Sequence, residues 1–107
     1  MELKQLITRA NDIREKYKEL EMKNYGKEWT NGQIAQGFMT NVGNLMKYAM
    51  TKDGIRDFEN ADQNLKHELS DCLWCIFILA NNYGVDLEKA FLETMDELEI
   101  TISKNYE

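Results

Sequence analysis

Two carboxylates lie one helical turn apart in the segment Glu68-Leu69-Ser70-Asp71. Because residues i and i+3 share a helix face, both side chains can point to the same place. The longest uncharged apolar run of the chain, 72–80, follows directly, so we expect the two acids to be partly buried. A buried carboxylate needs a partner, and a hard divalent cation is one of the standard ones. The pair therefore indicates a metal site, although the same spacing is also common on wet helix surfaces.

A second group of candidate residues is polar and uncharged. It steps by three and four positions along one predicted helix and comprises Gln33, Gly37, Thr40, Asn41, Asn44 and Tyr48. No acidic residue occurs between Glu28 and Asp53, although 19 of the 107 residues are acidic. A solvated helix face of this chain would carry Glu and Lys. The stripe is therefore typical either of a polar cleft or of an amide-rich surface, and the residues alone leave both open.

Other catalytic patterns are excluded or disfavoured. Cys72 and Cys75 have the C-x-x-C spacing of redox proteins, but inside an apolar helix we expect buried, inert thiols. His67 is the only histidine, so neither a histidine metal cage nor a Ser-His-Asp triad can form. The six glycines form no phosphate-binding or dinucleotide-binding loop.

Length and charge narrow the class of protein. A chain of 107 residues is expected to form one domain, 1–107. Its net charge of −6 argues against a nucleic-acid polymer or an anionic membrane as partner. The apolar run is about half the length of a bilayer span, and the first residues form no signal-peptide core. Two cysteines without a secretory signal are expected to be reduced, so we predict a cytoplasmic protein.

The elements that must position these residues are helices. The chain has no proline, and apolar residues recur at helical spacing in four segments, near 3–23, 31–51, 61–83 and 87–102. Gly26 and Gly84 are expected to end the first and third helices, Thr30 to begin a capping box and Asp86 to cap the fourth helix. We predict an all-α fold of four antiparallel helices, resembling a four-helix bundle. Because so small a bundle cannot cover the apolar third helix on all sides, we expect at least a homodimer that pairs through its apolar helices.

Several blocks of the sequence resemble the MazG-like all-α nucleoside triphosphate pyrophosphohydrolases. The blocks are Glu28-Trp29-Thr30, Asn41-Val42-Gly43-Asn44-Leu45-Met46-Lys47, His67-Glu68-Leu69-Ser70-Asp71-Cys72-Leu73-Trp74, Leu79-Ala80 and Gly84-Val85-Asp86-Leu87-Glu88-Lys89-Ala90-Phe91. The resemblance implies a compact four-helix module that assembles as a dimer or tetramer. It also implies hydrolysis of nucleoside triphosphates between the α and β phosphates, which gives the monophosphate and pyrophosphate. In that family, E-x-x-E on one helix and E-x-x-D on the next hold Mg²⁺.

The chain departs from the family pattern at the first carboxylate pair, where it has Asn41 and Asn44. By the resemblance, Glu68 and Asp71 are catalytic residues and ligands of Mg²⁺ or Mn²⁺, and the two asparagines are neutral metal ligands or phosphate contacts. Three interpretations stay open. The protein is an active enzyme with a rearranged metal site that draws on acids near the fourth helix, a weakened relative that binds nucleotides without turnover, or a helical assembly module. The acids in question are Asp86, Glu93, Asp96 and Glu97.

The resemblance implies further substrate contacts. Lys47 follows Asn44 by one turn and either reaches phosphate oxygens or is solvated. Trp29 either stacks on the base or covers the core. Lys104 and Asn105 resemble a basic, amide-bearing C-terminus that contributes to the substrate site in the family. The expected substrate is an NTP or dNTP, with the base and sugar left open.

Overall fold

The computed structural model describes residues 1–105, and within them the chain forms four α-helices and no strand. The helices are α1, Leu3–Tyr25; α2, Asn31–Lys52; α3, Ala61–Asn82; and α4, Leu87–Asn105. The all-α class predicted from the hydrophobic periodicity is confirmed. None of these helices has the length and apolar character needed to cross a membrane.

The helix ends follow from local sequence chemistry. Gly26 takes a left-handed φ of 72° after α1, and its N–H donates to the Met22 carbonyl at 3.0 Å. At the start of α2, Thr30 Oγ1 accepts from the Gln33 N–H at 3.2 Å, and Gln33 Oε1 accepts from the Thr30 N–H at 2.8 Å. Asp86 Oδ1 accepts from the N–H of Lys89 at 3.1 Å at the start of α4. The predicted caps at these positions are therefore confirmed.

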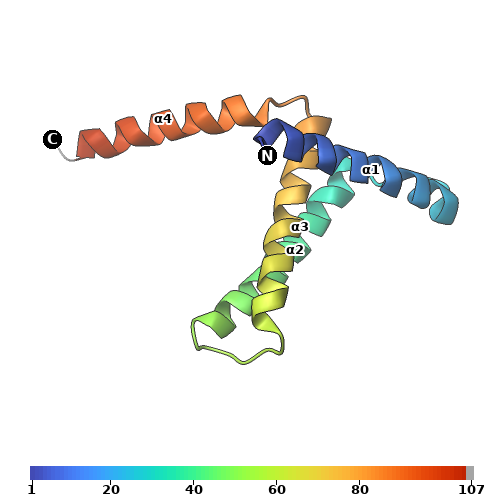
Figure 1. Cartoon of the computed structure of the whole chain (residues 1–107), viewed down its shortest axis with the longest axis horizontal. Helices are drawn as coiled ribbons and strands as arrows, with labels where there is room; N and C mark the ends of the chain where they lie inside the picture. The colour runs from blue at the N-terminus through green and yellow to red at the C-terminus, as the bar shows by residue number, and fades with distance from the viewer. Residues whose placement is uncertain (106–107) are drawn as a thin grey trace.

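The hairpin of α2 and α3 forms the body of the molecule, and α1 lies across one of its ends (Figure 1). That end is where α2 begins and α3 stops, so that Asn82 Nδ2 donates to Asn31 Oδ1 at 2.8 Å. A small core joins the three helices there, and Trp74 Nε1 donates to a carbonyl of α1, that of Ala10, at 3.1 Å. The buried core residues are Ala10, Ile34, Phe77 and Ile78.

The predicted closed bundle is not formed, because α4 does not join the hairpin. α1 and α4 extend to opposite sides of the hairpin end (Figure 1), and of the described part of α4 only Leu87 packs against the core. The radius of gyration is 17.3 Å, whereas a compact domain of this length has about 13 Å. The amphipathic pattern of α4 specifies which of its faces is apolar, but it does not specify what covers that face.

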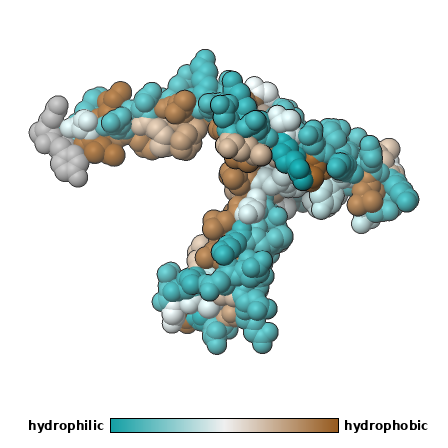
Figure 2. All heavy atoms as spheres, in the orientation of Figure 1, coloured by the Kyte–Doolittle hydropathy of each residue, from teal (hydrophilic) through white to brown (hydrophobic). Residues whose placement is uncertain are grey.

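Two apolar stripes are consequently exposed. On α4 the stripe consists of Phe91, Met95, Leu98 and Ile102, and Figure 2 shows hydrophobic side chains along this helix. On α3 the stripe consists of Leu69, Leu73 and Ile76. Within one chain, the apolar half of α3 is covered only on the side that faces α1 and α2, where Cys72, Cys75, Phe77 and Ile78 are buried.

Candidate functional site

An open cavity of about 900 Å³ lies between α1, the first half of α2 and the middle of α3. Three residues of the polar stripe on α2 line it: Gly37, Thr40 and Asn41. Gln33 instead belongs to the helix cap, and Tyr48 packs edge-on against Phe58 with the ring centroids 6.5 Å apart. The middle of the stripe therefore faces a cleft, whereas its two ends have structural roles.

The carboxylate pair of α3 is half-buried beside this cavity, and Asp71 lines it. Glu68 Oε2 is buried and has no hydrogen-bond partner within residues 1–105. His67 Nε2 lies 3.0 Å from Asp71 Oδ2, and ligand atoms of His67, Glu68 and Asp71 all lie within 4.8 Å of one another. A buried carboxylate oxygen with no donor, next to a second carboxylate, is an arrangement that a bound cation would satisfy.

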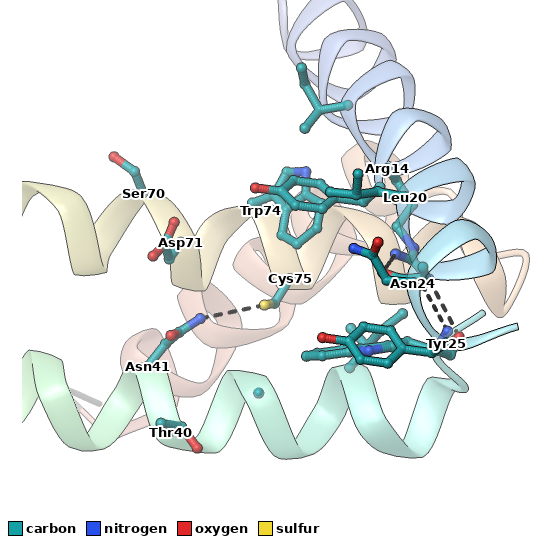
Figure 3. A pocket seen from close by; sticks show the side chains of 16 residues that line it. Arg14, Leu20, Asn24, Tyr25, Thr40, Asn41, Ser70, Asp71, Trp74 and Cys75 are labelled. Carbon is teal, nitrogen blue, oxygen red and sulfur yellow. Dashed lines mark hydrogen bonds and ion pairs between the residues drawn. The ribbon is translucent and has the colours of Figure 1, made fainter. Parts of the chain in front are cut away.

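Of the two asparagines of α2, Asn41 lines the cavity and Asn44 does not. Asn41 Nδ2 donates to Cys75 Sγ at 3.7 Å, a contact drawn in Figure 3, so its carbonyl oxygen stays available. In this antiparallel register, one turn along α2 from Asn41 brings half-buried Asn44 to the level of Asp71. Because an amide oxygen is a ligand that Mg²⁺ accepts, both asparagines are compatible with a metal site, but they add no negative charge.

The two thiols are buried and free, as predicted. Burial raises the pKa of Cys72, and the nearby carboxylates of Glu68 and Asp71 raise it further. Burial also raises the pKa of Cys75, against an opposing effect of its hydrogen bond from Asn41. Neither group has the lowered pKa of a redox thiol.

Other residues that the sequence suggested for this site lie elsewhere. Lys47 does not line the cavity, because its ammonium lies 5.1 Å from the Phe58 ring centroid and 5.5 Å from that of Tyr48. Lys104 and Asn105 are in the last turn of α4, which extends away from the hairpin (Figure 1). The same direction of α4 separates Glu93, Asp96 and Glu97 from Asp71, and Asp86 acts as the helix cap. Within one chain, the structure does not bring these residues to the carboxylate pair.

The other end of the cavity is aromatic. Trp29 lines it with 47% of its surface exposed, and its ring lies in van der Waals reach of Gly37. The cavity is also lined there by Tyr17, Tyr25 and Trp74. Sequence reasoning singled out Trp29 but missed the two tyrosines, because α1 carries no recognisable motif. Trp74, in the apolar half of α3, packs at the edge of the core and also forms part of the cavity wall.

A buried ion pair holds the aromatic end in place. Arg14 Nη1 lies 2.6 Å from Glu21 Oε2, and Arg14 Nη2 lies 3.1 Å from Glu21 Oε1. The N–H of Trp29 also donates to Glu21 Oε1, at 2.8 Å. The hydrogen bonds from Arg14 are the main cause that lowers the pKa of Glu21 from its ordinary value, against the opposing effect of burial. Glu21 is therefore ionised at neutral pH and fixes the chain where it turns from α1 into α2.

Comparison with protein families identifies a MazG nucleotide pyrophosphohydrolase domain over residues 39–100. The match includes most of α2, all of α3 and most of α4, and so contains Asn41, Asn44, Glu68 and Asp71. No curated protein and no solved structure matches the chain closely enough to add to this comparison. Because the matched region covers more than half of the sequence, the chain belongs to the MazG nucleotide pyrophosphohydrolase family.

Proposed function

We propose that the protein hydrolyses nucleoside triphosphates to the monophosphate and pyrophosphate, with Mg²⁺ or Mn²⁺ as cofactor. The observation that carries this proposal is the buried, unpartnered Glu68 Oε2 beside Asp71 at a cavity of nucleotide size. Glu68 and Asp71 would be the metal ligands, and Asn41 and Asn44 would add neutral oxygens from the facing helix. MazG proteins are typically metal-dependent, which supports the same assignment.

The proposed reaction is hydrolysis of the phosphoanhydride bond between the α and β phosphates. Water adds to the α phosphorus, the bond from the α phosphorus to its bridging oxygen breaks, and pyrophosphate leaves with that oxygen. A divalent ion at Glu68 and Asp71 would offset phosphate charge and make the bound water more acidic. An amide cannot accept the proton of the water, so that role would go to Glu68 or Asp71. The neutral asparagines would lower the affinity for the metal compared with a site of four carboxylates.

A product assay tests this proposal. The purified chain is incubated with each NTP and dNTP and with Mg²⁺ or Mn²⁺, and monophosphate and pyrophosphate are quantified. We expect both products in equal amounts, and we expect their loss in Asp71→Asn. The matched control is Asp57→Asn in the exposed loop between α2 and α3, which should keep full activity. Product that persists in Asp71→Asn would come from a contaminant or from another site and would contradict the assignment.

The alternative is a module that binds nucleotides without hydrolysing them. The observation in its favour is the replacement of two expected carboxylates by Asn41 and Asn44. A rise of the melting temperature with nucleotide, in the absence of any product, would support it. No shift with any nucleotide or metal would leave only an assembly role.

We further propose that the protein is a homo-oligomer in which a second copy covers the exposed stripes of α3 and α4. Most of α4 belongs to the matched family domain, yet of its described residues only Leu87 packs against the core, and Phe91, Met95, Leu98 and Ile102 are exposed. The helices also differ in charge, because α4 has five acidic and two basic side chains, whereas α1 has four acidic and six basic ones. Pairing of the acidic α4 with the more basic α1 of a second copy would cover the apolar face of α4 and would bring opposite charges together.

A further inference from the structure

The cavity has two ends of different chemistry, and the second end is not explained by metal or phosphate binding. Figure 3 shows Asp71, Asn41 and Thr40 on one side, and Trp74, Tyr25 and Asn24 on the other. A nucleotide has the same two parts, a charged phosphate chain and a planar aromatic base. The cavity is therefore suited to a nucleotide that lies along it in one direction only.

Aromatic side chains line the second end of the cavity. Trp74 and Tyr17 pack against each other with ring centroids 5.9 Å apart, and Tyr25 lies on the opposite side of the gap in Figure 3. Tyr25 is 70% exposed, so most of its ring is open to a ligand. Aromatic side chains bind nucleobases by stacking, and stacking accepts any base because every base has a π face.

The wall of this gap that α1 forms contains a buried ion pair. Arg14 is only 3% exposed, and its guanidinium is held by both oxygens of Glu21. Arg14 Nε is buried and makes no hydrogen bond to the part of the chain that the structure describes. A polar donor is thus left over behind the aromatic walls, in a side chain that lines the cavity.

Asn24 is placed to recognise the edge of the base. It lies in the last turn of α1 and lines the cavity, and Figure 3 shows its amide between Trp74 and Tyr25. Its side chain is exposed, so its amide donor and its amide acceptor are both accessible to a ligand. The Watson–Crick edge of each common base offers a donor next to an acceptor, which one amide can match.

We propose that this aromatic end is a nucleobase slot and that Asn24 is the residue that reads the base. The proposal rests on the pyrophosphohydrolase function, because it names where the base of that substrate binds. The residues that form the slot on the α1 side precede residue 39, where the family match begins. The proposal thereby places binding of the base in the N-terminal part of the chain, and binding of the metal and the phosphates in the part that matches the family.

Nucleoside monophosphates in EDTA test the slot without metal and without turnover. Binding is followed by the fluorescence of Trp29 and Trp74, which both line the cavity. We expect Trp29→Leu and Asn24→Ala to weaken binding by about tenfold each. The control Asn81→Ala, an exposed amide of α3, should bind the monophosphates as the unchanged chain does. Circular dichroism checks that each variant keeps its helix content.

Specificity gives a second readout. A carboxylate only accepts hydrogen bonds, so Asn24→Asp should shift the preference towards guanine, which presents two adjacent donors, N1–H and the N2 amino group. Inorganic tripolyphosphate with Mg²⁺ should bind equally well to the unchanged chain and to Asn24→Ala. If tripolyphosphate competes as well as a nucleotide does, the base is not recognised and the slot is wrong.

The outcomes separate the slot from the hydrolase. Base binding that depends on Asn24, with no pyrophosphate from any triphosphate, supports the slot and overturns the proposed reaction. Product formation that is indifferent to Asn24→Ala and Trp29→Leu overturns the slot and leaves the reaction standing. Tryptophan fluorescence that responds to protein dilution but not to nucleotide shows that a second copy fills the gap, and this also overturns the slot.

Discussion

Arg14 and Glu21 form a two-point ion pair within α1, seven residues apart, and the same carboxylate holds the backbone of Trp29. Three consequences meet at this pair. It lines one end of the cavity, it fixes the chain direction between α1 and α2, and it holds two charges in a buried position. The pair therefore links the stability of the fold to the shape of the candidate binding site.

Removal of one partner of the Arg14–Glu21 ion pair should lower the free energy of unfolding substantially. Arg14→Met leaves the Glu21 carboxylate buried without its cation, so we expect a loss of about 3 kcal/mol in the free energy of unfolding. Urea denaturation followed by circular dichroism measures this loss. The double variant Arg14→Met with Glu21→Leu should recover most of it, because no charge is then left buried. A double variant as unstable as the single one would show that packing, and not charge, explains the effect.

The same pair predicts how stability depends on pH. The pKa of Glu21 in the folded protein is lowered from the ordinary 4.5, so its ionised form stabilises the fold. This contribution is complete above the unfolded pKa and is lost as the pH falls through the folded value. The difference in unfolding free energy between the unchanged chain and Glu21→Gln should therefore be large at neutral pH and shrink on acidification. Glu19→Gln, an exposed neighbour, should show little difference at any pH.

Glu68 should lower the stability of the metal-free chain but be required for metal binding. Its unpartnered buried oxygen destabilises the metal-free chain, so Glu68→Met should raise the free energy of unfolding by about 1 kcal/mol in EDTA. The same variant should lose the rise in melting temperature that Mg²⁺ or Mn²⁺ gives the unchanged chain. Thermal melts with and without metal decide the point. A Glu68→Met chain that still responds to the metal would place the ion elsewhere.

Restoring the first carboxylate pair should strengthen the metal site. Asn41→Glu with Asn44→Glu brings two more acids towards Glu68 and Asp71, so we expect the metal-free chain to lose about 2 kcal/mol of stability and to regain it with Mg²⁺. Metal affinity and the rate of pyrophosphate release should both rise. Titration with Mn²⁺, followed by electron paramagnetic resonance, measures the affinity. Unchanged affinity would show that residues 41 and 44 do not face the ion.

The exposed stripe of α4 can be tested by a matched pair of substitutions. Leu98→Asp puts a charge on the stripe, whereas Ile100→Asp makes the same kind of change on the opposite side of the helix, where Ile100 is also exposed. We expect the first to weaken self-association by about tenfold or more and the second to leave it nearly unchanged. Sedimentation equilibrium measures both. Equal effects of the two variants would exclude the stripe as the interface.

The sequence predicted the helices well because their ends depend on local chemistry. The Thr30–Gln33 capping box and the Gly26 stop involve only neighbouring residues, so they can be recognised without knowledge of the fold. Glu68 and Asp71 were also identifiable, since one helical turn separates them and an apolar run follows. These features require no information about long-range packing.

The failures concern relations between distant parts of the chain. The direction of α4 depends on what covers its apolar face, which periodicity does not encode. Lys47 has the spacing of a phosphate ligand, yet Phe58, from the loop after α2, draws its ammonium away from the cavity. The contribution of α1 to the cavity was missed because Asn24 and Tyr25 become candidates only once α1 is known to cross the hairpin end.

The short connection between α3 and α4 sets the direction in which α4 extends. Gly84 there has a left-handed φ of 68°, which a residue with a side chain adopts only under strain. At a rise of 1.5 Å per residue, α4 reaches about 28 Å from this point, so a rotation of about 10° would carry Lys104 through about 5 Å. Backbone angles at a residue remote from the cavity thus decide where the C-terminal turn lies, and a substitution at Gly84 would act at the far end of α4.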